Sequence, residues 1–225
     1  MSALGAALAA HGTAAVSDAL DLAGVSSTLW GVRRLSGTGM VVGPAFTVRF
    51  APVADGVRAP AADFIDDVPP GSVVVIANEG RHCTVWGDIL AEVALARRLA
   101  GTVVDGYCRD IDGIRELGYP MWARGAFMRS GKNRVRMAAA QEPVTVGAAD
   151  DRITVRPGDL VAADGSGVVV VPRGLVDEVV ETVTRVAAME RLVLADVRAG
   201  TPLREARANH GYNEVARRST AGGPS

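Results

Sequence analysis

The spacing of apolar residues predicts a strand, a helix and a second strand near the centre of the chain. Residues 73–77 form an unbroken apolar run and residues 102–105 a shorter one, as is typical of strands buried on both faces. Between them, residues 88–100 carry apolar positions at helical spacing, and Gly101 is expected to cap the end of this helix. Strand, helix and strand in this order indicate an α/β fold.

Shorter elements flank this central unit. Residues 38–53 are predicted as two strands because Gly43 and Pro44 interrupt them. Residues 144–171 are predicted as a series of strands separated by glycine-containing turns. Thr13 is expected to cap the start of a helix that follows it. Hairpins and alternating strands and helices therefore occur in the same chain.

The composition favours one domain with a sizeable core. The chain has 225 residues, of which 48% are hydrophobic and 22% charged. It contains no internal repeat and no evident linker. We therefore expect a single domain over residues 1–200, followed by a polar tail over residues 201–225 whose end is disordered.

The charge pattern limits the classes of partner. The net charge is −1 with no basic cluster, and only 4% of residues are aromatic, so we expect no nucleic-acid binding. No apolar run approaches about 18 residues, which predicts no membrane span. The first twelve residues lack the basic start and long apolar core of a signal peptide. These features predict a cytoplasmic protein.

The cysteines and the lysine limit the chemistry further. Cys83 and Cys108 are the two cysteines, and with His82 they match no standard zinc-ligand spacing, so we expect reduced thiols. Lys132 is the one lysine, and its polar surroundings in the sequence suggest no apolar pocket that would lower its pKa. Chemistry through a Schiff base is therefore not expected.

Two acidic residues and an arginine lie where ligands bind in α/β folds. Asp88 begins the predicted helix, whose first N–H groups are free to bind an anion. Arg109 and Asp110 follow the second strand. If the two strands are neighbours, all three side chains converge at one sheet edge. The structural alternatives are that Asp88 stabilises the helix dipole and that the Arg109–Asp110 pair is a surface ion pair.

A long helix predicted from about residue 175 to residue 199 carries an acidic residue on its apolar stripe. The stripe follows steps of three and four residues, and Glu190 falls where the stripe expects an apolar residue. A carboxylate on a packing face is costly unless it is paired or functional. Glu190 therefore either pairs with an arginine of a neighbouring element or is presented to a site, across a subunit interface in the second case.

Three segments resemble the RraA-like proteins: WGDILA, GTVVDGYCRDIDGIRELGYPMWARG and VRPGDLVAADGSGVVVVP. This family includes class II 4-hydroxy-4-methyl-2-oxoglutarate/4-carboxy-4-hydroxy-2-oxoadipate aldolases and regulators of ribonuclease activity. Its active-site signature is an aspartate, twenty intervening residues and an Arg-Asp pair, which Asp88, Arg109 and Asp110 satisfy. The resemblance extends from about residue 13 to the long helix.

The resemblance implies a fold, an assembly and a set of residue roles. The fold would be a single β/β/α swivelling-type domain, and the assembly a homotrimer or a hexamer. Asp110 would hold Mg²⁺ or Mn²⁺, Arg109 would contact the substrate oxygens, and Glu190 is the candidate for a glutamate that reaches the site from a neighbouring subunit. The backbone amides of one loop would bind pyruvate; its residues are Gly87, Asp88, Ile89 and Leu90.

The resemblance also implies an activity. The chain would be a metal-dependent pyruvate aldolase that cleaves 4-hydroxy-4-methyl-2-oxoglutarate-type substrates to pyruvate and a second oxo acid, with oxaloacetate decarboxylation as a side activity. Asp88 would hold a water that acts as acid or base. Two alternatives stay open: a non-catalytic regulator that binds a ribonuclease, and a lyase of the same chemistry acting on another 2-oxo acid.

Overall fold

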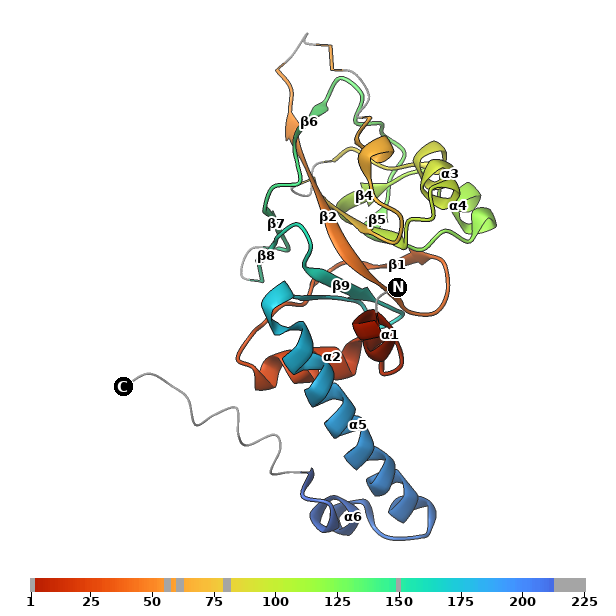
Figure 1. Cartoon of the computed structure of the whole chain (residues 1–225). Helices are drawn as coiled ribbons and strands as arrows, with labels where there is room; N and C mark the ends of the chain where they lie inside the picture. Colours follow the sequence, from red (N-terminus) through yellow and green to blue (C-terminus); the bar gives the residue numbers. More distant parts are fainter. Residues whose placement is uncertain (1–2, 55–57, 60–62, 79–81, 149–150, 213–225) are drawn as a thin grey trace.

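A computed structural model describes residues 3–54, 58–59, 63–78, 82–148 and 151–212. Its main sheet has the strand order β1-β5-β4-β3-β2-β9-β10, with β6 also paired to β2 (Figure 1). Strands β2, β3, β4 and β5 are parallel to one another, whereas the other pairings are antiparallel. The strands are β1 Arg33–Ser36, β2 Val41–Pro52, β3 Val73–Ala77, β4 Gly101–Cys108, β5 Met121–Ala126, β6 Val135–Ala140, β9 Leu160–Ala163 and β10 Val168–Val171, and a separate pair is formed by β7 Val144–Val146 and β8 Ile153–Val155.

Two groups of helices cover different parts of this sheet. Helices α3 and α4 and the 3-10 turn η1 lie beside β3, β4 and β5, whereas α1, α2 and α5 pack together beside β9 and β10 (Figure 1). The C-terminal half of α5 extends away from the sheet and meets α6. The helices are α1 Ala3–Ala9, α2 Gly12–Leu22, α3 Asp88–Ala96, α4 Ile111–Leu117, α5 Val176–Arg198 and α6 Leu203–Asn209, with 3-10 turns η1 Phe64–Asp67 and η2 Arg173–Leu175.

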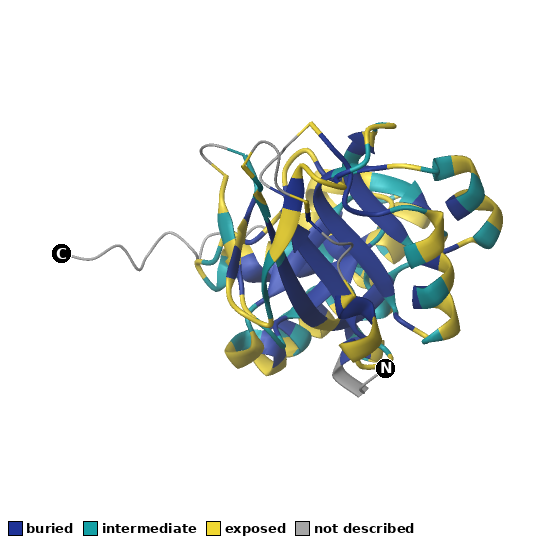
Figure 2. Cartoon of the chain, turned by 90° about the horizontal axis from the view of Figure 1, so that it is seen from above, coloured by how far each residue is buried: buried dark blue, intermediate teal, exposed yellow. Residues whose placement is uncertain are grey.

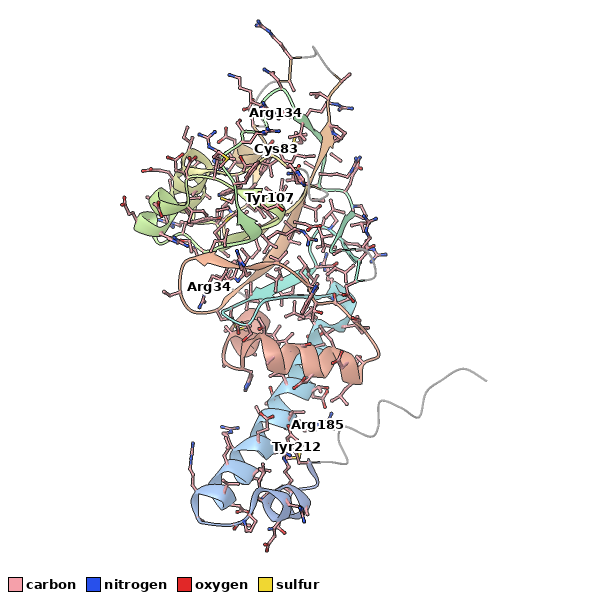
Figure 3. The ribbon with its side chains drawn as sticks, turned by 180° about the vertical axis from the view of Figure 1, so that it is seen from behind. Arg34, Cys83, Tyr107, Arg134, Arg185 and Tyr212 are labelled. Atoms are coloured by element: carbon pink, nitrogen blue, oxygen red, sulfur yellow. The ribbon has the colours of Figure 1, made fainter. Side chains whose placement is uncertain are left out.

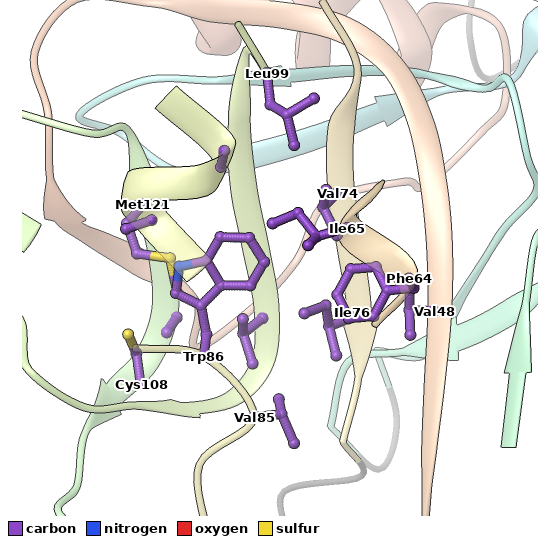
Figure 4. Close-up of a cluster of buried hydrophobic side chains, with 14 of the residues drawn as sticks. Val48, Phe64, Ile65, Val74, Ile76, Val85, Trp86, Leu99, Cys108 and Met121 are labelled. Atoms are coloured by element: carbon purple, nitrogen blue, oxygen red, sulfur yellow. The ribbon is translucent and has the colours of Figure 1, made fainter. Parts of the chain in front are cut away.

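The central strands are buried on both faces, which explains their unbroken apolar sequence. Every residue of β3 is at most 1% exposed, and Figure 2 shows the middle of the sheet as buried. One core lies between the sheet and the α3–α4 layer, where Trp86 and Phe64 pack with Ile76 and Met121 (Figure 4). The predicted α/β single-domain fold is confirmed. None of the helices in the described ranges is long and apolar enough to cross a membrane.

The prediction of two strands over residues 38–53 is wrong, because β2 is one strand of twelve residues. Its residues 41–44 pair with β9, and its residues 45–49 pair with β3. Pro44 lies at this change of partner. Proline has no N–H to donate, and at this position no single hydrogen-bond ladder has to continue through the residue. The Gly-Pro signal therefore marks a change of partner within one strand.

Helix α3 ends at Ala96, so the predicted cap at Gly101 is also wrong. Arg98 adopts a left-handed conformation with φ 58°, and its carbonyl accepts a hydrogen bond from Gly71 N at 2.8 Å. Ala100 N then donates to Ser72 O at 2.8 Å. These bonds to the turn before β3 leave Gly101 as the first residue of β4.

Thr13 does not cap a helix, because α2 begins one residue earlier at Gly12. Its N–H and hydroxyl instead donate to the two carboxylate oxygens of Asp164, at 2.9 and 2.7 Å. The long helix α5 is close to its predicted range. Helix α6 lies within residues 201–225, where no helix was predicted; residues 213–225 are outside the described ranges.

Candidate functional site

Strands β3 and β4 are parallel neighbours, which satisfies the condition for convergence. Val73 pairs with Gly101 and Ala77 with Asp105, so both strands end at the same edge of the sheet. Beyond the edge the two chain segments stay together, because Arg109 N donates to Trp86 O at 3.0 Å. The start of α3 is thereby placed directly beside the Arg109–Asp110 pair.

Gly87 lies directly against the Arg109–Asp110 pair. It precedes α3 in an extended conformation, with φ −156°, that any residue can adopt. A Cβ atom at this position would lie 2.6 Å from Asp110 Oδ2 and 3.2 Å from Arg109 Cγ. The space that a side chain would need is therefore occupied by the Asp110 carboxylate. The structure thus brings together the start of α3 and the Arg-Asp pair.

Asp110 has a strained backbone held by its surroundings. Its φ of 55° and ψ of 37° are left-handed, which costs a non-glycine residue roughly 1 kcal/mol. The conformation is held in place because Asp110 O accepts a hydrogen bond from Ile114 N at 3.1 Å, in the first turn of α4. Such strain is found preferentially at functional sites.

Arg109 and Asp110 form an ion pair that remains open to solvent. Arg109 Nε donates to Asp110 Oδ2 at 2.8 Å, and the two side chains are 44% and 30% exposed. An exposed pair of this kind contributes less than about 1 kcal/mol to stability. Asp110 Oδ1 accepts no hydrogen bond from any described residue. The pair therefore keeps one carboxylate oxygen available for a ligand.

Asp88 is the first residue of α3 and is exposed. Its Oδ1 accepts a hydrogen bond from Ile89 N at 2.8 Å, so part of its role is to satisfy an otherwise free N–H of the first turn. A Cβ at Gly113 of α4 would lie 3.7 Å from Asp88 Cβ, which places Asp88 against the start of α4. Both structural and chemical roles are compatible with this position.

A pocket with a volume of about 330 Å³ contains all these groups. The first turn of α3 lines it together with Arg109 and Asp110, as the sequence predicts. Apolar side chains and a polar turn form other parts of its lining; the apolar residues include Phe50, Phe64, Val85 and Val135, and the turn is Ser130, Gly131 and Lys132.

Lys132 is a functional candidate that the sequence did not reveal. Lys132 is exposed, and the structure places it in the lining of the same pocket as Phe50 and Phe64, which its surroundings in the sequence did not indicate. Those two side chains come from β2 and η1, far from Lys132 in the sequence. The one signal that could have found Lys132 was its rarity, because the chain has no other lysine.

The two cysteines are buried and form no disulfide. Burial, together with the nearby charge of Asp110, raises the pKa of the Cys108 thiol to about 12, so Cys108 is protonated at neutral pH. The ring of His82 packs edge-on against Tyr107 with centroids 6.5 Å apart. No group of three or more His, Cys, Asp or Glu side chains gathers around a metal position in the part of the chain that the structure describes.

Glu190 lies on α5 and is not among the residues that line the pocket. It is half-buried, and its Oε1 accepts a hydrogen bond from the Tyr212 hydroxyl at 3.3 Å, whereas no arginine within the described ranges pairs with it. Figure 3 shows Tyr212 at the opposite end of the molecule from Arg134, which adjoins the pocket turn. A single chain therefore does not bring Glu190 to the site, and its role across a subunit interface stays a prediction.

Comparison with known proteins gives a consistent family. Residues 13–170 match the RraA-like family model, described as Aldolase/RraA. The chain is 34% identical over 172 residues to a Halalkalibacterium halodurans protein named "Putative 4-hydroxy-4-methyl-2-oxoglutarate aldolase", covering 75% of this chain and 76% of that protein.

Two further similarities extend the comparison. The chain is 38% identical over 205 residues to protein DlpA of Legionella pneumophila, which covers 90% of this chain but 33% of that protein. The chain thus spans about a third of the length of that relative. The crystal structure of Streptomyces coelicolor RraAS2, described as an unusual member of the RNase ES inhibitor RraA protein family, superposes with a TM-score of 0.77 at 31% identity, covering 87% of this chain and 97% of that chain.

Proposed function

The chain belongs to the RraA-like family, and from its pocket we propose that it is a divalent-metal-dependent, class II pyruvate aldolase. It would cleave 4-hydroxy-4-methyl-2-oxoglutarate-type substrates to pyruvate and a second oxo acid. Oxaloacetate decarboxylation would be a side activity because it releases the same three-carbon product. The observation that carries the proposal is the close approach of Asp110 and Arg109 to Gly87, which places both side chains beside the first turn of α3.

The first turn of α3 would bind the carboxylate of the pyruvate half. The N–H groups at a helix start lack intrahelical partners, and the helix dipole favours an anion there. Gly87, Asp88, Ile89 and Leu90 all line the pocket. Ile89 N is satisfied by the Asp88 carboxylate, so the substrate would use the remaining N–H groups or displace that bond.

Arg109 would stabilise the negative charge that develops during cleavage. In a retro-aldol reaction the C4 hydroxyl loses its proton, the C3–C4 bond breaks and the electron pair moves into the 2-keto group. A guanidinium remains charged at any working pH and can donate to the keto oxygen as it becomes negative. Asp88, in the same pocket, would take up the hydroxyl proton directly or through a water.

Asp110 would hold the metal ion, Mg²⁺ or Mn²⁺. Magnesium is commonly bound through one or two carboxylates, with waters and substrate oxygens as its other ligands, and in this pocket Asp110 would be the carboxylate ligand. When bound, the ion supplies Lewis acidity toward the keto oxygen.

A coupled pyruvate-release assay tests the proposal. Wild-type protein should release pyruvate from 4-hydroxy-4-methyl-2-oxoglutarate and from oxaloacetate, chelator should abolish the release, and Mg²⁺ or Mn²⁺ should restore it. Because Lys132 lines the pocket, borohydride trapping with pyruvate is the matching control for imine chemistry. Activity that survives chelator, or a reduced pyruvate adduct on Lys132, would refute the metal-dependent mechanism.

The second candidate function is a non-catalytic ribonuclease regulator. The observation that favours it is the similarity to RraAS2, which is described within an RNase inhibitor family. A regulator has no requirement for the Asp88 and Arg109-Asp110 arrangement. Failure to release pyruvate from any 2-oxo acid, combined with direct binding to a ribonuclease, would favour this second function.

A homotrimer or hexamer is the expected assembly. Large apolar side chains are exposed on the far end of α5 and on α6: Leu192 is 53% exposed, Leu194 49% and Leu203 47%. Exposed large apolar groups on an extended arm are consistent with an interface. Light scattering on the purified chain should give three or six times the 23.3 kDa chain mass.

A further inference from the structure

Lys132 supplies the pocket with a second positive charge. Arg109 comes from the end of β4, whereas Lys132 comes from the turn before β6. Arg109 is paired with Asp110, but the Lys132 ammonium has neither a hydrogen bond nor an ion pair with any described residue. The pocket therefore contains a cation with no partner within the chain's described part.

The turn that carries Lys132 is fixed to the segment that leads into the site. Thr84 N donates to Arg129 O and Gly131 N donates to Thr84 O, both at 2.8 Å. A Cβ at Gly131 would lie 2.6 Å from Thr84 O, so this close backbone pairing requires a glycine. Residues 84–87 thus connect the turn to the start of α3 through a short stretch of chain.

Hydrogen bonds within the turn fix its shape. Lys132 N donates to Ser130 Oγ at 3.1 Å, and Val135 N donates to Gly131 O at 3.0 Å. Asn133 takes a left-handed conformation with φ 60°, and its Oδ1 accepts a hydrogen bond from Ala59 N at 3.1 Å. The backbone that carries Lys132 is therefore ordered before any ligand binds, which reduces the entropy cost of using it as an anchor.

The rest of the lining explains what this cation would bind. Phe50, Phe64 and Val135 offer no polar side-chain group to a ligand, and in the described lining Lys132 is the one cation other than Arg109. A 2-oxo acid with one carboxylate uses the first turn of α3 alone. A second carboxylate would place its charge in a partly apolar pocket that needs a cation.

We propose that Lys132 is a specificity-determining residue that binds the distal carboxylate of a dicarboxylic 2-oxo acid. The inference rests on the proposed function for the placement of the pyruvate half against α3. Lys132 would select substrates that carry a second carboxylate over substrates of equal length with a neutral end. An ammonium–carboxylate contact at a partly exposed site should change affinity by about tenfold.

The test is a binding comparison that needs no turnover. In the presence of Mg²⁺, 2-oxoglutarate and 2-oxopentanoate have the same chain length and differ in one distal carboxylate, and calorimetry gives both affinities. Wild-type protein should bind 2-oxoglutarate about tenfold more tightly. Lys132→Met should remove this preference without changing 2-oxopentanoate binding, and Lys132→Arg should retain most of it. Arg136→Met is the control, because Arg136 is an exposed cation of β6 outside the pocket lining.

Each outcome of this binding comparison either supports or overturns the role of Lys132 in binding the distal carboxylate. Three results would overturn the inference. They are a preference for 2-oxoglutarate that survives Lys132→Met, a wild-type protein that binds both ligands equally, and a Lys132→Met variant that loses affinity for both ligands to the same extent. The pyruvate-release assay on the same preparations reports on the proposed function separately. If binding of the dicarboxylate depends on Lys132 but no substrate is turned over, the aldolase proposal fails and the distal carboxylate site stands. If substrate is turned over but binding shows no preference that depends on Lys132, the distal site fails and the aldolase proposal stands.

Discussion

Gly87→Ala should damage the site while leaving the fold intact. The added methyl group would lie 2.6 Å from Asp110 Oδ2, whereas an ordinary carbon–oxygen contact is about 3.3 Å or longer. The Asp110 carboxylate must therefore retreat by about 0.7 Å, and Arg109, whose Cγ is 3.2 Å from the same position, must move with it. Misplacement on the order of 1 Å costs about a hundredfold in rate, or roughly 2.7 kcal/mol.

The same substitution should have little effect on stability. Gly87 has an extended backbone that alanine also adopts. Because alanine has fewer conformations than glycine in the unfolded chain, the substitution would stabilise the variant by roughly 0.4–1 kcal/mol. Overpacking costs about 1–3 kcal/mol in a well-packed core. Here the displaced side chains are 44% and 30% exposed and can move toward solvent, so the cost should lie near the lower end. The two effects largely cancel.

The assay compares kcat/KM for pyruvate release, Mg²⁺ affinity and the melting temperature across three proteins. Gly174→Ala is the matched control, because a Cβ at Gly174 meets no atom within 4 Å and its φ is not positive. Gly87→Ala should lose about a hundredfold in kcat/KM and should bind Mg²⁺ more weakly, while both variants melt near the wild type. Wild-type kinetics in Gly87→Ala, or a loss that tracks unfolding, would refute the reasoning.

Three further outcomes are expected. Asp110→Asn should abolish metal-dependent turnover in the pyruvate assay yet cost less than about 1 kcal/mol in chemical denaturation, because its ion pair with Arg109 is exposed; unchanged turnover would contradict the metal role. Glu190→Gln should lower kcat by at least about tenfold without changing the assembly measured by light scattering, if the residue acts across an interface; a variant that only dissociates would show a structural role. Because the folded pKa of Cys108 is raised to about 12, stability should fall as pH rises from the ordinary thiol pKa of 9.0 toward about 12, and Cys108→Ala should flatten that dependence in denaturant titrations.

The half of the site proposed to bind the metal and the pyruvate moiety could be predicted from sequence, because it is built from one continuous stretch. The apolar runs of β3 and β4 identify two buried strands, and the helix between them returns the chain to the same sheet edge. Asp88 and Arg109-Asp110 follow from that geometry alone. What sequence could not give is the contact at Gly87, since the closeness of Asp110 depends on the left-handed backbone at that aspartate.

Element ends were less predictable because distant backbone groups determine them. The amphipathic pattern of α3 continues to residue 100, but the carbonyl of Arg98 and the N–H of Ala100 bond to the turn before β3, and this ends the helix at Ala96. At Pro44, the sequence indicated a break where the strand only exchanges one partner for another. In both places a local signal was present, but its meaning was set by a non-local neighbour.

The remaining lining of the pocket depends on contacts between elements that are far apart in the chain, and this division has a functional consequence. Phe50 belongs to β2, Phe64 to η1 and Lys132 to the turn before β6, so no sequence window contains them together. None of them belongs to the strand–helix–strand segment that carries Asp88 and Arg109. Substitutions at these three positions can therefore change which 2-oxo acid fits without moving the groups proposed to break the bond. The groups proposed for the chemistry and those proposed for the specificity therefore lie on separate parts of the fold, which would allow the two to vary independently.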